Sequence, residues 1–390
     1  MMRNFGTTGV LIVGGGPAGL AAAIALRQRG ADVTVADAMK PPIDKVCGEG
    51  LMPNSLHELA RLGVELTPAD GAAFRGIRFV HGDDVATAEF PAGVGIGLPR
   101  QRLHSRLVAR AEEVGVKLRW QSPVQLLKDG EVRVAGEMVR YRWLIGADGQ
   151  SSRVRGWAGL DDVKTISRRF GFRRHFQVTP WSSFVEVHWG WSGQVYVTPT
   201  GPREVCVAAV TGDSRYRLGD LLEELPGLSA ILGGLLAEPV DRERGALTTT
   251  RRLRKVAASL PKHGRVALLG DASGSADAVT GEGMGIAFRQ ALLLAECIEA
   301  EDLARYNRLH PATLRLPQTM AKVMLLMDRR DDLRNRAIGM LVEEPKLFAH
   351  MLGVHLGSES MTRFVMERGL QMAWRLAIQP VENSLPVELA

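Results

Sequence analysis

The sequence predicts a mixed α/β (α+β) fold, in which a parallel nucleotide-binding sheet is interleaved with an antiparallel sheet and followed by helices. Three observations support this fold class. An apolar run, a glycine-rich turn and a helix-forming segment follow one another within residues 9–37. Residues 166–210 alternate between apolar and polar side chains, as half-buried antiparallel strands do. From Leu303 onward the chain is rich in helix formers and shows no further strand pattern.

The stretch from Gly9 to Asp37 predicts the first strand, turn and helix of a dinucleotide-binding unit. Val10 to Val13 is a continuous apolar run, typical of a strand that is buried on both faces. Gly14, Gly16 and Gly19 then form a G-x-G-x-x-G pattern. The first glycine permits a tight turn, the second lets the backbone approach a pyrophosphate, and the third lets the helix pack closely. The free N–H groups and positive end of the helix would face that pyrophosphate.

Asp37 ends the next predicted strand. Its distance from the glycine turn is close to the roughly 20 residues expected for a carboxylate that binds a ribose hydroxyl. A secretory signal is the competing interpretation, because an uncharged stretch follows Arg3. Three consecutive glycines and Pro17 would break its apolar core, and no small-residue cleavage site leads into a new domain, so we reject it.

The other elements are predicted from the same patterns. A loop rich in proline and glycine, containing Lys45 and Cys47, follows Asp37. Beyond it we expect a short helix at 56–62, a hairpin at 77–80 and 85–90, a helix at 100–114, short strands near 118, 132 and 143–145, strands across 166–210, helices at 218–225 and 228–236, a buried strand at 265–269 and a helix ending near 298.

The composition excludes several classes of protein. The net charge of +6 is mild for 390 residues, and no basic block interleaved with aromatic residues indicates a nucleic-acid groove. Apart from the rejected segment, no apolar run is long enough to span a membrane. The three cysteines are few, odd in number and far apart, which favours a reducing cytoplasm over a disulfide scaffold. We expect no metal site.

Three separated motifs resemble those of a known superfamily. They are GGGPAG at the start, GADGQSSRVR at 146–155, and LLGDASGSADAVTGEGMG at 268–285. Together they resemble the FAD-dependent oxidoreductases shaped like p-hydroxybenzoate hydroxylase and geranylgeranyl reductase, over roughly residues 9–300. The resemblance implies a Rossmann-like FAD-binding domain, FAD as cofactor, and NADPH or NADH as electron donor.

The resemblance also implies cofactor-binding residues. The first motif would hold the ADP half of FAD, Asp148 would lie near the pyrophosphate, and Asp271 would bind the ribityl chain. Asp271 also closes a buried strand at the sheet edge where α/β ligands bind, and its plainer role would be a helix cap. The expected cofactor-binding residues are Gly14, Gly16, Pro17, Ala18, Gly19, Asp37, Lys45, Arg100, Asp148, Gly270, Asp271, Gly281, Gly283 and Met284.

We expect three interleaved regions. The FAD-binding domain would comprise residues 1–75, 99–165 and 255–325. A substrate-binding sheet domain would comprise 76–98 and 166–254, and a helical C-terminal region would comprise 326–390.

The expected reaction depends on the branch of the superfamily. Lys45-Val46-Cys47-Gly48 resembles the K-x-C-G segment of geranylgeranyl reductases, which saturate isoprenoid or related lipid chains, but Ala278 stands where that branch usually has proline. We therefore favour a single-component NAD(P)H-dependent monooxygenase that hydroxylates an aromatic, polyketide or quinone-like apolar substrate. The alternatives are a flavin reductase that saturates C=C bonds, a flavin-dependent halogenase, and a flavin-binding regulator without catalysis.

Three further features bear on the reaction and the substrate. Cys47 and His188 are the candidate catalytic residues, although packing is the slightly better explanation of the cysteine. Trp189-Gly190-Trp191 matches half of a halogenase signature, and core or pocket wall is the better interpretation. The segment Met361 to Leu376 places Met361, Phe364, Val365, Met372 and Leu376 on one helical side, which predicts a packing helix, a lid, or contact with a membrane surface. The oligomeric state stays open.

Overall fold

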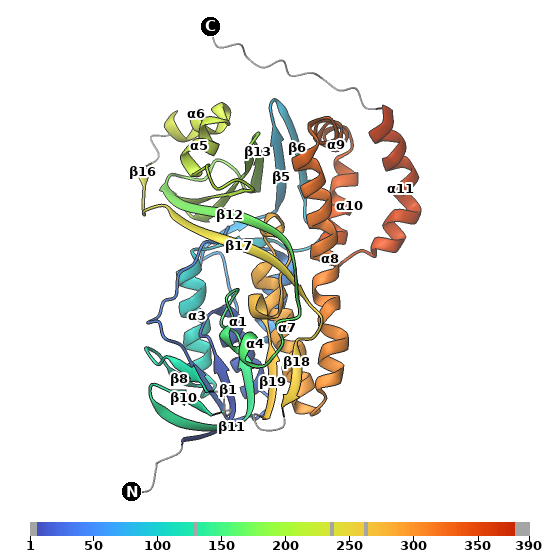
Figure 1. Cartoon of the computed structure of the whole chain (residues 1–390). Helices are drawn as coiled ribbons and strands as arrows, with labels where there is room; N and C mark the ends of the chain where they lie inside the picture. Colours follow the sequence, from blue (N-terminus) through green and yellow to red (C-terminus); the bar gives the residue numbers. More distant parts are fainter. Residues whose placement is uncertain (1–5, 128–130, 235–237, 261–263, 379–390) are drawn as a thin grey trace, which may run out of the picture.

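Strand β1 (Gly6–Val13) lies in the middle of a sheet that carries the predicted nucleotide-binding turn in this computed structural model (Figure 1). The structure describes residues 6–127, 131–234, 238–260 and 264–378. Parallel strands run in the order β19 (Gly264–Leu268), β11 (Glu137–Gly146), β1, β2 (Val33–Ala36) and β8 (Lys117–Arg119). Three antiparallel strands complete this sheet: β18 (Ala257–Leu260), β10 (Val132–Val134) and β9 (Val124–Leu126).

Helices cover both faces of this first sheet. On one face lie α1 (Pro17–Arg27), α3 (Arg100–Glu113) and α7 (Gly283–Glu299), and α2 (Pro53–Arg61) packs against α7. Ala21, Ala22 and Ala23 of α1 are small and fully buried, which lets this helix lie close to the strands. On the other face α4 (Arg153–Trp157) buries Val154 against Leu144 and Leu268.

A second sheet lies above the first (Figure 1). Its order is β16 (Glu238–Pro239), β12 (Val163–Gln177), β15 (Glu204–Thr211), β14 (Gly193–Gly201), β13 (Val185–Trp189), β5 (Gly76–His81) and β6 (Asp84–Glu89), and β17 (Arg244–Leu253) also pairs with β12. A small third sheet of β3 (Gly50–Leu51), β7 (Gly95–Gly97) and β4 (Ala72–Phe74) lies beside β14.

The second sheet departs from the expected half-buried antiparallel sheet in two ways. Strand β13 pairs with β5 in parallel. A parallel pair needs a long connection, and β5 comes from a distant part of the chain. Most residues of β13, β14 and β15 are buried on both faces. Helices α5 (Leu218–Glu223) and α6 (Pro226–Gly234) lie on one side, while the 3₁₀ turn η2 (Ala278–Thr280) and helix α8 (Leu303–Arg329) lie near the other.

The C-terminal part is helical, as the sequence predicts. Helix α8 (Leu303–Arg329) runs from the first sheet to the second, and α9 (Asp331–Glu343), α10 (Pro345–Leu356) and α11 (Met361–Ile378) follow it (Figure 1). Ile338 and Phe348 pack with Trp189 in one apolar cluster. None of the helices in the described part of the chain is both long and apolar enough to cross a membrane.

The mixed α/β fold class is confirmed, while the division of the chain into three regions stays a prediction. Three local expectations need correction. Helix α2 begins at Pro53 instead of Leu56, because proline fits the first helical turn. Trp191 is 68% exposed in the turn between β13 and β14, and Val365 is 53% exposed on α11. The turn points Trp191 outward, and the packed face of α11 is narrower than its apolar pattern suggests.

Candidate active site

The glycine-rich turn between β1 and α1 has the shape of a cradle for a pyrophosphate. Gly14 has a φ of 109°, and a Cβ there would lie 2.4 Å from the Ala147 carbonyl oxygen. A Cβ on Gly19 would lie 1.9 Å from the Gly14 carbonyl oxygen, so this glycine allows the close packing of helix on turn. A Cβ on Gly16 would meet no atom within 4 Å. The space in front of Gly16 is therefore open, at the N-terminus of a helix whose first residue is Pro17.

Asp37 lies directly beside this turn. Its Oδ2 accepts a hydrogen bond of 2.7 Å from the Gly15 N–H, and its Oδ1 accepts one of 2.7 Å from the Met39 N–H. His104 of α3 supports the same turn, with its ring Nε2 2.8 Å from the Gly15 carbonyl oxygen. The carboxylate thus fixes the turn, and its remaining lone pairs can accept a ribose hydroxyl.

The second motif forms the loop between β11 and α4. Asp148 accepts hydrogen bonds from Ser152 Oγ at 2.6 Å and from the Arg153 N–H at 2.7 Å, which anchors the start of α4. Gly149 has a φ of 80°, and the Nζ of Lys45 lies 3.3 Å from the position its Cβ would take. The structure therefore brings Lys45 to this loop, although more than 100 residues separate them.

The third motif contains Asp271, which follows strand β19, and the N-terminus of α7. Asp271 is exposed to solvent although many protein atoms lie around its carboxyl, as in a side chain that lines an open recess. Burial raises the pKa of its carboxyl, and the charges of Lys45, Arg100 and Arg251 lower it. Gly270, before it, donates its N–H to Gln290 Oε1 at 2.8 Å.

The helix opened by the third motif begins at Gly283, two residues later than the first glycine of its sequence pattern. Gly281 has a φ of 66° and ends η2, a conformation that favours glycine. A Cβ on Gly281 or Gly283 would meet nothing within 4 Å, and Met284 is buried behind them. The 17-residue helix α7 thus offers a bare, electropositive end.

These features fit FAD. Open space lies in front of Gly16, Gly281 and Gly283, and the buried Nε of Arg100 has no hydrogen-bond partner among the described residues. A cofactor with a pyrophosphate and polar ring edges would occupy such space and satisfy such a donor. The residues that would hold it are those expected from the sequence, namely Gly14, Gly16, Pro17, Ala18, Gly19, Asp37, Lys45, Arg100, Asp148, Gly270, Asp271, Gly281, Gly283 and Met284.

The two candidate catalytic residues lie in different surroundings. Cys47 is a free thiol whose Sγ accepts a hydrogen bond of 3.3 Å from the Glu49 N–H. Burial raises the pKa of this thiol, and the nearby charge of Arg100 lowers it. His188 is buried in β13, with Nε2 3.1 Å from Oε2 of Glu186. The Arg100 contact places Cys47 beside the cradle, whereas the hydrogen-bond partner of His188 belongs to the second sheet.

A buried charge cluster was not expected from the sequence. Glu49 Oε1 accepts from the Arg173 guanidinium at 2.8 Å, and Glu49 Oε2 lies 2.6 Å from Nε2 of His175. Arg173 also bonds Asp44 at 3.0 Å and Asp241 at 3.1 Å. Arg173 and His175 are two residues apart on β12, so their side chains share one face of the strand. In the sequence this pattern indicates only an ordinary polar strand face. Only the fold shows that the loop after Asp37 brings two carboxylates onto that face.

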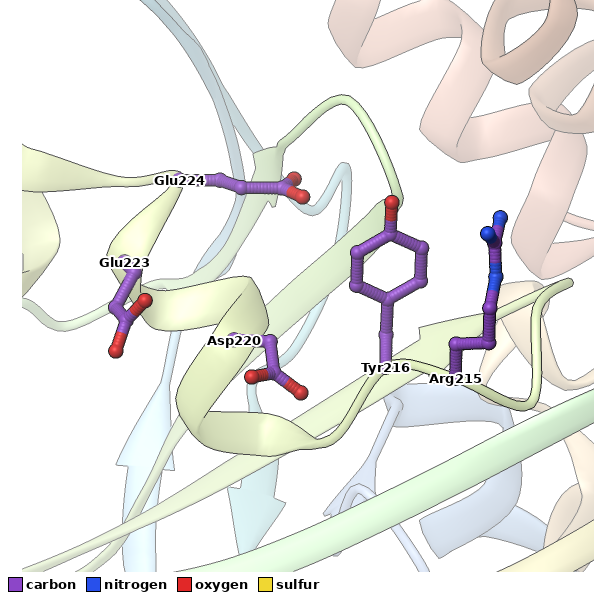
Figure 2. Close-up of a pocket in the computed structure, with 5 residues that line it drawn as sticks. All are labelled: Arg215, Tyr216, Asp220, Glu223 and Glu224. Atoms are coloured by element: carbon purple, nitrogen blue, oxygen red, sulfur yellow. The ribbon is translucent and has the colours of Figure 1, made fainter.

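A charged recess on the surface lies elsewhere. Figure 2 shows it beside α5, with a volume of about 560 Å³ and a lining of Arg215, Tyr216, Asp220, Glu223 and Glu224. The Glu224 carboxylate accepts the Ser192 N–H at 2.9 Å and so fixes the β13–β14 turn. This charged recess lies with α5, on the far side of the second sheet from η2, so it does not belong to the cofactor cradle.

Comparison with known proteins gives related flavoproteins. Residues 7–302 match a family described as FAD binding domain. Menaquinone reductase of Mycobacterium tuberculosis H37Rv is 29% identical over 331 residues, which cover 76% of this chain and 78% of that protein. Digeranylgeranylglycerophospholipid reductase of Methanocella arvoryzae is 27% identical, covering 76% and 81%. A putative FAD-dependent monooxygenase of Bacillus subtilis is 25% identical, covering 81% and 92%.

A solved structure has the same fold. The flavoprotein/dehydrogenase from Cytophaga hutchinsonii superposes with a TM-score of 0.77, covering 95% of this chain and 98% of that one at 16% identity.

Proposed function

Since the chain belongs to the FAD binding domain family and is an FAD-dependent oxidoreductase, we propose that it saturates C=C bonds in the isoprenoid chain of a lipid or quinone. The single observation that carries this proposal is the position of the free Cys47 thiol at the edge of the cradle, beside Arg100. Saturation of an alkene needs a hydride and a proton. A half-buried thiol in this position is suited to supply the proton.

The comparisons support the same direction. The menaquinone reductase and the digeranylgeranylglycerophospholipid reductase each match about three quarters of this chain. When bound, FAD supplies hydride transfer between an electron donor and the substrate, and we take NADPH or NADH as that donor. No second glycine fingerprint is present in the sequence, so the nicotinamide would bind transiently over the flavin.

The chain's own residues would orient these partners. Arg100 lies near both Cys47 and Asp271, because its charge lowers the pKa of each group. The charge of Lys45 also lowers the pKa of Asp271. These two cations would attract the phosphates and the electron-rich edge of the cofactor while Cys47 holds its proton at Sγ.

For the substrate chain we propose a path along η2. Four aromatic residues, Phe184, Trp189, Trp191 and Tyr196, lie in or beside β13 and β14. Trp189 is in the core and Trp191 is exposed, while Phe184 lies under the guanidinium of Arg75. Tyr196 alone contacts the cradle side, donating a 2.8 Å hydrogen bond to the Val279 carbonyl oxygen. It packs there against Val279 and Met324 of α8, an apolar wall suited to an isoprenoid chain.

The second candidate is the monooxygenase favoured from the sequence. Ala278, which departs from the reductase pattern, begins η2 and packs in that wall. The similarity to a putative monooxygenase over 81% of the chain supports this candidate as well. A halogenase or a flavin-binding regulator has no comparable support from the site.

One experiment separates the two candidates. The FAD-loaded protein is mixed with NADPH and a menaquinone carrying two isoprene units, with and without O₂. The reductase gives a product with two hydrogens added across a C=C bond of the side chain under both conditions, measured after any quinol has been reoxidised to the quinone. A product with one added oxygen, formed only when O₂ is present, would decide for the monooxygenase.

A further inference from the structure

A row of three side chains connects the Cys47 loop with the surface. The carboxylate Oε2 of Glu49 lies 2.6 Å from Nε2 of His175. The other ring nitrogen of His175, Nδ1, lies 3.0 Å from Oδ2 of Asp241. Both distances are hydrogen bonds, so an imidazole bridges two carboxylates. An imidazole in this position can receive a proton at one nitrogen and release another from the second.

The inner end of the row lies at the candidate proton donor. Glu49 is fully buried and donates its N–H to Cys47 Sγ at 3.3 Å. The Cys206 thiol of β15 hydrogen-bonds the Glu49 side chain, and its Sγ lies 3.7 Å from the Cys47 carbonyl oxygen. A proton leaving the Glu49 carboxylate can therefore pass to the Cys206 thiol, which lies against the Cys47 backbone.

The outer end of the row reaches solvent. The side chain of Asp241, between β16 and β17, is 31% exposed, whereas His175 and Glu49 are buried. Asp241 also accepts the backbone N–H of His175 at 2.9 Å, which fixes the carboxylate against the ring. Water can exchange a proton with Asp241, and from there the path leads inward only through His175.

The charges around His175 favour its protonated form. Burial alone would lower the pKa of the imidazole, but hydrogen bonds and charge from Glu49 and Asp241 raise it above its usual value, against the repulsion of Arg173. The charged and titratable groups of this cluster are Asp44, Cys47 and Glu49 of the loop after β2, Arg100 of α3, Arg173 of β12, Cys206 of β15, Asp241, and Arg244 of β17.

A metal ion is the competing interpretation, because Glu49, His175 and Cys206 place three ligand atoms within 4.8 Å of one another. Two ligands of a tetrahedral zinc ion, each about 2.0–2.1 Å from the metal, would lie about 3.3 Å apart. The Glu49–His175 distance of 2.6 Å is shorter and belongs to a shared proton. Arg173 at 2.8 Å from Glu49 already supplies the positive charge that a metal would bring.

We propose that Asp241, His175 and Glu49 form a proton relay that reprotonates Cys47 during turnover, a proposal that rests on the reductase function above. When bound, reduced FAD would supply the hydride, and with it both electrons, to one carbon of the alkene. The Cys47 thiol gives its proton to the other carbon, so that two C–H bonds form and one C=C π bond is lost. The Cys47 thiolate then regains a proton from Nε2 of His175 through Glu49 and the Cys206 thiol, and water restores the imidazole through Asp241.

The test uses Asp241→Asn and His175→Gln in the FAD-loaded protein. The protein is reduced without O₂ and mixed with a menaquinone carrying two isoprene units, over a range of pH in H₂O and D₂O. We expect the first turnover to proceed and later turnovers to slow by roughly 100-fold, with a larger solvent isotope effect. His350→Gln and Asp332→Asn, in exposed ion pairs outside the site, are the matched controls.

A second readout needs no turnover. The ring signals of His175, followed by NMR in the FAD-loaded protein, should titrate above the usual histidine range and move to lower pH in Asp241→Asn. Unchanged titration, or wild-type rates at every pH in both folded variants, would overturn the relay, as would one equivalent of bound zinc. A wild-type protein that never saturates the alkene would instead contradict the proposed function.

Discussion

The backbone N–H of Gly15 donates a 2.7 Å hydrogen bond to Oδ2 of Asp37. This bond connects the residues that follow the carboxyl ends of β1 and β2, at the cofactor turn. The sequence assigns Asp37 to a ribose hydroxyl, and the structure gives it a second task. It holds the peptide next to Gly16 in the orientation that leaves the cradle open. Binding and shape of the site therefore depend on one carboxylate.

Asp37→Ala should weaken FAD binding. Loss of a hydrogen bond to a charged group is worth about 1.5–3 kcal/mol, or roughly 10- to 150-fold in Kd. Fluorescence titration of the apoprotein with FAD measures the change. Asp37→Asn, which keeps an oxygen for Gly15, should recover part of the affinity. An Ala variant with wild-type affinity would contradict the role of Asp37.

Gly16 and Gly19 should respond differently to an added side chain. Gly16→Val should abolish FAD binding while the apoprotein keeps its stability, because the space before Gly16 is empty of protein. Gly19→Ala should destabilise the apoprotein by about 1–3 kcal/mol or more, because its Cβ would lie 1.9 Å from the Gly14 carbonyl oxygen. Urea unfolding and retained FAD distinguish the two. Equal FAD affinity in Gly16→Val and the wild type would refute the cradle.

The local parts of the site could be predicted from the sequence. The glycines at 14, 16 and 19 act through backbone geometry near their own position, so their spacing is sufficient. The cluster of Glu49, Arg173 and His175 could not be predicted, because it forms only when β12 meets the loop after β2. The expectation that Trp191 lies in the core or a pocket wall is wrong for a similar reason, because its position depends on the path of the folded chain. The polarity pattern of β13 continues into it, but Gly193 turns the chain back and leaves Trp191 outside.

Arg173→Met should strongly destabilise the protein. The substitution leaves the buried carboxylates of Asp44 and Glu49 without their partner, at a cost of about 3–5 kcal/mol. Paired charges lower the pKa of Asp44 against the effect of its burial, so the stability it contributes is present above its usual 3.8 and is lost as pH falls through the lowered value. The difference between variant and wild type should therefore shrink in acid. Urea unfolding at several pH values measures it, and a difference that grows in acid would show the sign to be wrong.

His175→Gln should have the opposite pH dependence. Hydrogen bonds to Glu49 and Asp241 raise the pKa of His175 despite burial, so its stabilising effect is complete below the ordinary value of 6.5. That effect is lost as pH rises through the higher folded-state pKa. The stability difference between wild type and His175→Gln should be largest in mild acid and decline toward alkaline pH. His350→Gln serves as the control in the same unfolding series, and a constant difference across this range would contradict the prediction.

The outer face of α11 provides the last prediction. Met366, Leu370 and Trp374 recur at four-residue intervals and are 80%, 88% and 67% exposed, on the helix at the edge of the molecule (Figure 1). The same helix carries Arg363, Arg368 and Arg375; Arg363 pairs with Glu367 of this helix, and Arg375 pairs with Glu344. An apolar row flanked by positive charge is complementary to an anionic membrane surface, where an isoprenoid substrate would reside, so we propose peripheral contact there.

The protein should therefore sediment with vesicles that contain phosphatidylglycerol, and a smaller fraction of it should sediment with neutral vesicles. Each fully buried apolar side chain contributes about 1.5–3 kcal/mol, so Leu370→Ser with Trp374→Ser should reduce binding at least roughly tenfold. Val323→Ser on α8, an exposed apolar residue outside this row, is the matched control. If the wild type were instead a dimer that the double variant converts to monomer, with vesicle binding absent in both, the face would be a contact between copies of the chain and the membrane prediction would be wrong.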